Sequence, residues 1–427
     1  MAQKMSLWLE HLSPQNIRGH ITNFHWRESF TALNYRNYRL WFWGQMVSLF
    51  GTWMQSTAQG YLIYQLTQSS TYLGYLSFAT GIPSWLFMVY AGVVADRMPR
   101  RTLLIITQTC MMVLAFMLSI LTFTDLVQPW HILILAFLLG TANAFDVPTR
   151  HSFLLELVDR KDLTNAIALN SAMFNSALAV GPAASGLAYA LFGPGWCFMI
   201  NAVSFLAVIW ALWLMEIAPH PAPLQRNSVF VDLKEGFQYV RTQPIVQILI
   251  VLIAVMGIFG FSFTTLFPAW AVKVLGGNET TNGLLQSARG VGALIGALGV
   301  ASLGRFNIKG KLLTIGTFTF PVVLWLFAAT RWLPLSLFTL LGVGAALVLV
   351  NNLANALVQT VIPDQLRGRV MGFYMFMFFG AMPIGGLFSG NLAEHIGAPL
   401  TLGLCALILL GFAGVLWFFA PKLRTLP

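Results

Sequence analysis

Long apolar runs alternate with short polar segments along nearly the whole chain. A run of about 20 apolar residues is long enough to cross a bilayer as a helix. Twelve such runs lie near residues 38–63, 72–95, 102–124, 130–150, 164–192, 196–217, 244–272, 282–304, 311–330, 333–356, 369–391 and 398–420. The pattern predicts an all-α membrane protein with twelve transmembrane helices.

One of the polar interruptions is much longer than the others. Residues 218–241 (APHPAPLQRNSVFVDLKEGFQYVR) begin with a proline-rich stretch and continue with an amphipathic pattern. This is typical of a linker followed by a short helix on the membrane surface. The linker divides the chain into a six-helix bundle over 36–217 and a second over 242–420, with an N-terminal arm over 1–35 and a tail over 421–427.

Composition also favours a membrane protein over a soluble one. Of the 427 residues, 57% are apolar and only 9% are charged, whereas about a quarter of the residues of a soluble domain are charged. The net charge of +10 would suit a nucleic-acid-binding protein. The bases, however, fall in short clusters between apolar runs, which is typical of membrane topology, so we expect no nucleic-acid partner.

The positions of these bases predict how the chain is oriented. Lys and Arg concentrate on the cytoplasmic side of a membrane, and twelve spans place 21 of the 24 bases in one set of alternate loops and ends. The exceptions are Lys273 and Arg331 in the other set and Arg289 within a run. We therefore expect both termini in the cytoplasm of a cell with a bacterial-type inner membrane, and a retained N-terminal arm that is not a signal peptide.

The two halves of the chain resemble each other. Residues 140–168 align without gaps on residues 344–372, with coincident apolar positions and loop lengths. This predicts an internal duplication with pseudo-two-fold symmetry.

Motifs for metal, cofactor or catalytic sites are missing from the sequence. The three cysteines lie in apolar runs without C-x-x-C or metal-ligand spacing, and no HExxH, Walker or nucleophile-elbow pattern occurs. We expect no metal, no cofactor and no enzymatic activity.

The densest group of charges lies in AGVVADRMPRR, between the second and third runs. It contains Gly92, Asp96, Arg97, Arg100 and Arg101. The arginines are typical of a cytoplasmic loop. The aspartate is not needed for topology, and it is placed to cap the N-terminus of a neighbouring helix and to pair with an arginine.

Six plus six spans, a central linker and this loop resemble the major facilitator superfamily, whose loop motif runs G-x-x-x-D-R-x-G-R-R/K. Pro99 stands where the family prefers glycine. The segments FTALNYRNYRLWFWGQMVSLFGTWM, LTNAIALNSAMFNSALAVGPAASG and LRGRVMG are similar to the bacterial branch that contains the enterobactin exporter and related secretion and efflux carriers. The resemblance implies that the loop is a conformational latch and that spans 1, 4, 7 and 10 surround a central cavity.

Asp146 and Arg150 lie four residues apart on one face of the fourth run, near its predicted inner end. Charge at membrane depth usually faces a cavity or a partner. The pair is either a site for substrate or protons in the cavity or an ordinary interfacial ion pair. Pro148 favours the interfacial position, because it is expected to end the regular helix there.

Arg289 is predicted to lie about 12 Å inside the eighth span from the outside. No acid of the second half lies at a matching depth. Its partner is therefore backbone carbonyls, water or an anionic substrate.

Two further groups of residues are candidates for the transport path. Gly181, Pro182 and Gly186 resemble the fifth-span motif of exporters, although a generic proline kink would look the same. Polar and aromatic residues on spans 1, 7 and 10 are candidates to line the cavity: Trp53, Gln55, Gln59, Thr264, Asn351 and Asn355.

These features predict a secondary active transporter. We expect a monomer that exports an amphipathic, siderophore- or drug-like small molecule by alternating access, with proton antiport as the family's usual energy source. The alternatives are a lysophospholipid or lipid flippase of the same fold and a non-transporting membrane sensor. Membrane lipid is the expected surrounding in each case.

Overall fold

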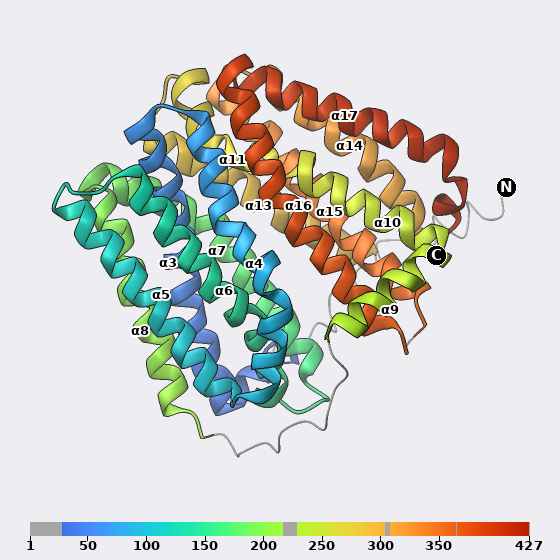
Figure 1. Ribbon diagram of the computed structural model, residues 1–427, viewed down its shortest axis with the longest axis horizontal. Helices are drawn as coiled ribbons and strands as arrows, with labels where there is room; N and C mark the ends of the chain where they lie inside the picture. The colour runs from blue at the N-terminus through green and yellow to red at the C-terminus, as the bar shows by residue number, and fades with distance from the viewer. Residues whose placement is uncertain (1–27, 217–228, 304–307, 364, 427) are drawn as a thin grey trace, which may run out of the picture.

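The described part of the chain is built from helices alone. The computed structural model describes residues 28–216, 229–303, 308–363 and 365–426, and these ranges contain no strand. Figure 1 shows the first half of the chain (blue to green) as one group of helices and the second half (yellow to red) as another beside it.

The first group follows a short 3-10 helix, η1 (Glu28–Asn34). Its helices are α3 (Arg36–Thr67), α4 (Ser70–Arg97), α5 (Arg100–Phe123), α6 (Pro129–Leu157), α7 (Leu163–Phe192) and α8 (Pro194–Leu214). Left-handed residues make the tight turns between some of them: Gln68 has φ 52°, Asp125 φ 55° and Gly193 φ 87°.

The second group follows α9 (Val229–Thr242), which occupies the C-terminal part of the predicted linker. It comprises α10 (Pro244–Val255), η2 (Met256–Gly260), α11 (Ser262–Thr265), α12 (Phe267–Ala269), η3 (Trp270–Val274), α13 (Glu279–Leu303), α14 (Lys309–Ala329), α15 (Leu333–Val361), α16 (Arg367–Ile396), α17 (Ala398–Phe419) and η4 (Pro421–Thr425).

Nine helical segments of the described residues are long and apolar enough to cross a membrane. They are α5, α6, α8, the segment Pro244–Val274, and α13 to α17. Three other helices, α3, α4 and α7, have 32, 28 and 30 residues. The predicted count of twelve spans rests on these three in addition to the nine.

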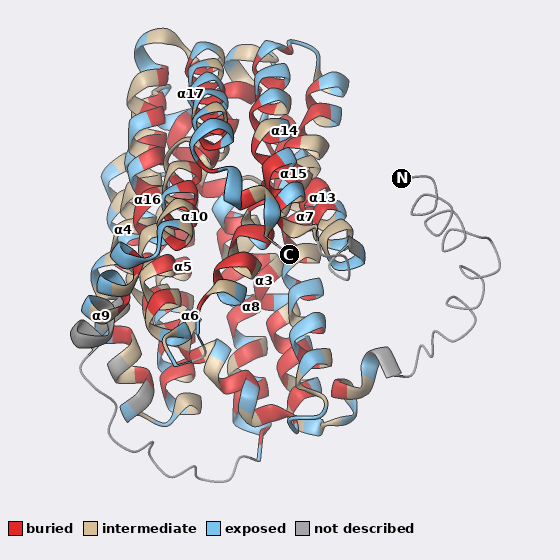
Figure 2. Ribbon diagram, turned by 90° about the vertical axis from the view of Figure 1, so that its right-hand side faces the viewer, coloured by how far each residue is buried: buried red, intermediate tan, exposed pale blue. Residues whose placement is uncertain are grey.

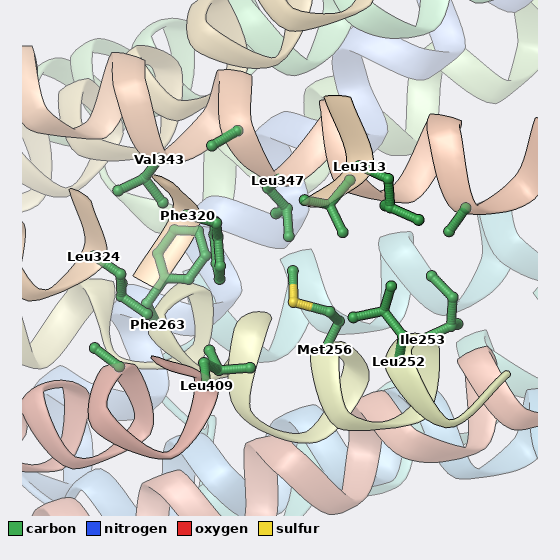
Figure 3. Packing of buried hydrophobic residues seen from close by; sticks show 14 of the residues in the cluster. Leu252, Ile253, Met256, Phe263, Leu313, Phe320, Leu324, Val343, Leu347 and Leu409 are labelled. Atoms are coloured by element: carbon green, nitrogen blue, oxygen red, sulfur yellow. The ribbon is translucent and has the colours of Figure 1, made fainter. Parts of the chain in front are cut away.

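Each group of helices has a large apolar cluster of its own, and a further cluster around Tyr61 and Tyr64 joins the first group to Ala269 of the second. The core of the second group gathers side chains from α10, η2, α11, α14, α15 and α17, such as Leu252, Met256, Phe320 and Leu347, which point toward one another in Figure 3. The first group has separate clusters, such as the one around Trp41 and Phe153. Figure 2 shows exposed and buried residues alternating along the same helices, as expected when one face meets lipid and the other meets neighbouring helices.

The two groups touch through small residues on two helix pairs, α4 with α16 and α7 with α13. A Cβ added at Gly390 would lie 2.6 Å from Cα of Gly74, and one at Gly283 would collide with the carbonyl oxygen of Pro182. Following the charge pattern, we call the end with connections 67–70 and 274–279 the outer end, and the opposite end the inner end. These glycine contacts lie in the outer halves of the helices.

The structure corrects one predicted helix boundary and adds detail to another span. The fourth run was expected to end near residue 150, but α6 continues through Pro148 to Leu157. A proline inside a span is tolerated where neighbouring groups satisfy the freed backbone carbonyl. The seventh run, predicted as one span near 244–272, is the segment Pro244–Val274, and it contains π-helical turns at η2 and η3.

The glycines of α13 permit a direct test of helix packing. A Cβ at Gly292 would collide with the carbonyl oxygen of Leu341 on α15, whereas a Cβ at Gly299 would meet no atom within 4 Å. We expect Gly292→Ala to lower the free energy of unfolding by about 1–3 kcal/mol, and Gly299→Ala to raise it by up to about 1 kcal/mol, because alanine favours a helix more than glycine does. Thermal unfolding in detergent measures both, and equal melting temperatures for the two variants would contradict this packing.

Candidate functional site

Asp146 lies at the centre of a buried hydrogen-bond network. Its side chain has no exposed surface, and its Oδ1 accepts from Thr107 Oγ1 and Gln108 Nε2 on α5, both at 2.9 Å. Its Oδ2 accepts from Arg150 Nε at 3.1 Å and also from the terminal guanidinium nitrogen of Arg150, one turn along α6. All four bonds come from the first group of helices.

This arrangement neutralises the carboxylate where charge would otherwise be costly. A buried ion pair is stabilised by further hydrogen bonds to its ions, and the Thr107 and Gln108 side chains supply two of them to the Asp146 carboxylate. The structure thus places the Asp146–Arg150 pair between α5 and α6 rather than at an exposed interface. A role in substrate or proton handling stays a prediction. Sequence reasoning missed Thr107 and Gln108, whose only signal was two adjacent polar residues within an apolar run.

The arginines of the charged loop fasten α5 to its neighbours. Arg100 forms an ion pair with Glu156 of α6 at 2.5 Å and donates to the carbonyl oxygen of Ser152 at 3.2 Å. Arg101 donates to the carbonyl oxygen of Trp213 on α8 at 2.9 Å. These bonds hold the inner end of the first group together.

The remaining motif residues lie at the end of α4. Gly92 has open space around its Cα, and Arg97 is exposed. Asp96 belongs to the last turn of α4, but its side chain lies outside the described part of the structure. Pro99 is the N-cap of α5 with φ −55°, a position where no backbone N–H is needed, which explains why proline can replace the family's glycine.

A polar stripe runs along α13 toward α3. Thr57 of α3 donates to Gln286 Oε1 at 3.3 Å, and Gln286 Nε2 donates to Asn282 Oδ1 at 3.4 Å. The amide nitrogen of Asn282 is buried without a partner among the described residues. The side-chain oxygens of Gln286 and Asn282 already accept hydrogen bonds. The side-chain nitrogen of Asn282 is therefore a donor that is still unused.

Arg289 continues this stripe one turn further toward the inner end. It lies ten residues into α13, about 15 Å from the helix start. Its buried Nε has no hydrogen-bond partner among the described residues, and none of their acids forms an ion pair with it. At 100° per residue, it points away from the exposed apolar face of α13 formed by Leu284, Val291, Ile295 and Leu298.

The predicted glutamines of the first span are bonded inside the first group. Gln55 Oε1 accepts from Asn201 Nδ2 on α8 at 2.6 Å, and Gln59 Nε2 donates to the carbonyl oxygen of Ile132 on α6 at 3.5 Å. Both glutamines are buried. In this conformation they pack α3 against its neighbours, and their role as cavity lining stays a prediction.

The predicted exporter motif of α7 lies between α3 and α13. A Cβ at Gly181 would lie 2.8 Å from Cβ of Trp53, whose ring packs on Phe174 at 5.7 Å. On the other side, a Cβ at Gly186 would lie 2.9 Å from the carbonyl oxygen of Glu279 at the start of α13.

Pro182 of the same motif is part of the contact between the two groups. The helix is assigned continuously through Pro182. The next residue, Ala183, donates its backbone N–H to Ser287 Oγ of α13 at 2.9 Å. The motif therefore joins the two groups as well as packing within the first.

The predicted cavity-lining residues of the second half lie on two different helices, Thr264 on α11 and Asn351 and Asn355 on α15. Thr264 lies in α11 between the two π-helical turns and donates to the carbonyl oxygen of Phe261 at 2.8 Å. Asn351 donates to the carbonyl oxygen of Leu347 at 3.0 Å, while its side-chain oxygen is buried without a partner among the described residues.

Asn355 borders a polar opening at the inner end of α15. The opening has a volume of about 690 Å³ and is lined by Asn352, Asn355, Ala356, Gln359, Thr360 and Arg367. Gln359 donates to Asn355 one turn away. Of Thr264, Asn351 and Asn355, it is Asn355 that borders this opening, beside Asn352.

The sequence of residues 28–426 matches the family described as transmembrane secretion effector. The chain is 25% identical to the staphyloferrin A transporter of Staphylococcus aureus, over 88% of this chain and 94% of that one. It is 27% identical to the multidrug efflux pump Tap of Mycolicibacterium fortuitum, over 86% and 91%. It is 24% identical to the enterobactin exporter EntS of Shigella flexneri, over 83% and 84%.

Solved structures show the same fold at low identity. A point mutant of the nucleoside transporter NupG has a TM-score of 0.71 at 16% identity, with 91% of this chain and 98% of that chain covered. A bacterial homologue of the human lysosomal transporter Spinster, in an inward-facing conformation, has a TM-score of 0.70 at 15% identity with the same coverage. These relatives are transporters and not enzymes.

The Asp146 network makes a prediction about stability. We expect Asp146→Asn to lower the free energy of unfolding by about 3 kcal/mol, because Arg150 would remain charged and lose its partner. The double variant Asp146→Asn/Arg150→Gln should recover part of this loss, since both groups are then neutral. Chemical unfolding in detergent measures the three proteins. An Asp146→Asn variant as stable as the wild type would show that the network does not hold α5 to α6.

Proposed function

The chain belongs to the transmembrane secretion effector family of the major facilitator superfamily, and we propose that it exports an amphipathic small molecule by alternating access. Its similarity over most of its length to efflux and siderophore transporters supports export. We include in the proposal twelve spans related by pseudo-two-fold symmetry, both termini in the cytoplasm, and a monomer in the bacterial plasma membrane.

Alternating access requires two bodies that can rock about a contact. The cluster around Phe320 and the cluster around Trp41 each contain residues of one group alone, which supports motion of the two groups as units. The glycine contacts lie in the outer halves of α4, α7, α13 and α16, and the polar opening lies at the inner end of α15. We assign this conformation to the inward-open state of the cycle.

Arg289 is the observation that carries the proposed substrate site. A cation at membrane depth normally has a partner, yet the described acids leave this one unpaired. The neighbouring Asn282 likewise has an unused buried donor. A ligand that supplies hydrogen-bond acceptors, above all an anionic group, would give the donors of Arg289 and Asn282 the partners they lack.

Protons are the proposed counter-ion. An inward pH gradient would drive export if an acid releases its proton in the inward-open state. Asp146, buried and bonded to Thr107, Gln108 and Arg150, is the candidate within the spans.

Uptake into inverted membrane vesicles tests this function. A panel with carboxylate siderophores, cationic drugs and a lysophospholipid should show uptake of an acceptor-rich or anionic amphiphile, and uptake should fall when the pH gradient is collapsed. Selective transport of the lysophospholipid, independent of the gradient, would identify a flippase instead. No uptake of any compound by correctly folded protein would contradict export.

The role of Arg289 is tested in the same vesicles. We expect Arg289→Gln to raise KM for the transported compound about tenfold or more, because a charge-assisted hydrogen bond is lost, and Arg289→Lys to have a smaller effect. Lys311→Gln, which removes an exposed charge at the start of α14, is the matched control and should leave KM unchanged. An unchanged KM in Arg289→Gln would remove Arg289 from the substrate site.

A further inference from the structure

Helices α4 and α16 form an antiparallel pair across the two groups, side by side in Figure 1. Gly74 lies against Gly390, Gly81 against Pro383, and Gly380 against Trp85. The two residue numbers of each pair add up to 464 or 465, so the register is constant along the contact. The same register places Ser70 opposite Glu394 and Asp96 opposite residue 368.

Each helix of this pair therefore carries an acid near its C-terminal end that lies in register with the N-terminus of the other helix. Asp96 is in the last turn of α4, in register with the start of α16 at Arg367. Glu394 is in the last turn of α16, in register with the start of α4 at Ser70. A carboxylate is stabilised at a helix N-terminus by the unpaired N–H groups and the helix dipole.

At the outer end this contact is formed. Glu394 Oε2 accepts from the backbone N–H of Ser70 at 2.6 Å, from Ser69 Oγ at 3.0 Å and from the backbone N–H of Thr71 at 3.4 Å. One carboxylate oxygen of the second group thus caps a helix of the first. Separation of the two groups at the outer end would break this cap.

Basic residues surround the contact. Lys273 of η3 donates to the carbonyl oxygen of Gln68, just before α4, at 3.3 Å. With Glu394 and Arg331, it lines a hollow of about 290 Å³ at the outer end. Lys273 and Arg331 are the two bases that the charge pattern assigns to the outside. Lys273 adds a second bond between the groups beside the Glu394 cap.

We propose that Glu394 is the outer latch of the transport cycle, a positioning residue that holds the inward-open state closed on the outside. The inference rests on the proposed alternating access. When the outer end opens, Glu394 leaves the N-terminus of α4. The other end of the same helix pair then closes, and Asp96 comes to the N-terminus of α16. The register places each acid opposite a helix start, and rocking of the two groups about the contact between the two ends makes the two caps successive alternatives.

The test measures outer-end opening without any substrate. Ser77, which lies beside Gly386 in the α4–α16 contact, is changed to cysteine in a background without Cys110, Cys197 and Cys405. A membrane-impermeant maleimide is added from outside, and its reaction rate reports how often the contact opens.

We expect Glu394→Gln to raise the reaction rate about tenfold, because a charge-assisted cap becomes a neutral one, and Glu394→Ala to raise it further. The matched control is Asp125→Asn, an exposed acid at the same end whose left-handed φ of 55° suits asparagine. It should leave the rate unchanged.

The outcomes separate the latch from the proposed function. A wild-type reaction rate in folded Glu394→Gln and Glu394→Ala would overturn the latch, whatever the transport result. An increased rate together with no transport of any tested compound would support the latch and contradict the export function. An equal increase in Asp125→Asn would overturn the latch as well, since the effect would then follow surface charge rather than the cap.

Discussion

The contact between α4 and α16 constrains the rest of the molecule. Gly74 and Gly390 let the two backbones meet, and the carboxylate of Glu394 caps α4 across the same contact. With the α7–α13 contact around Pro182 and Gly283, it joins two groups of helices, each of which has a large apolar cluster of its own. Because the contacts lie toward one end, a small rotation about them changes access at the other end.

Charges inside the helices divide into two kinds. Asp146 is saturated by Thr107, Gln108 and Arg150, and such a network stabilises the fold of the first group. Arg289 has a buried nitrogen without a partner among the described residues. In a low-dielectric medium an unpaired cation is costly, so Arg289 is the position at which binding of an acceptor would gain the most free energy.

The sequence predicted the helical architecture well because lipid imposes a strong apolar pattern on each span. The sequence predicted fewer of the side-chain contacts that depend on which helices pack against each other. Asp146 was recognisable as an isolated acid, but Thr107 and Gln108 become its partners only through the packing of α5 on α6. Glu394 was not among the predicted site residues, because its target, the N-terminus of α4, is more than 300 residues away in the sequence. The π-helical turns of the seventh run had no local signal, and Pro148 was misleading because α6 continues through it.

The central claim is that the two groups of helices rock about their contacts and open alternately at the two ends. Double electron–electron resonance tests this claim by measuring distances between spin labels. The labels are placed on two pairs of exposed positions, Asp125 with Trp332 at the outer end and Arg160 with Gln359 at the inner end. Addition of a transported compound should populate a state in which the outer distance lengthens while the inner distance shortens. Two distances that stay constant, or that lengthen together, would contradict alternating access.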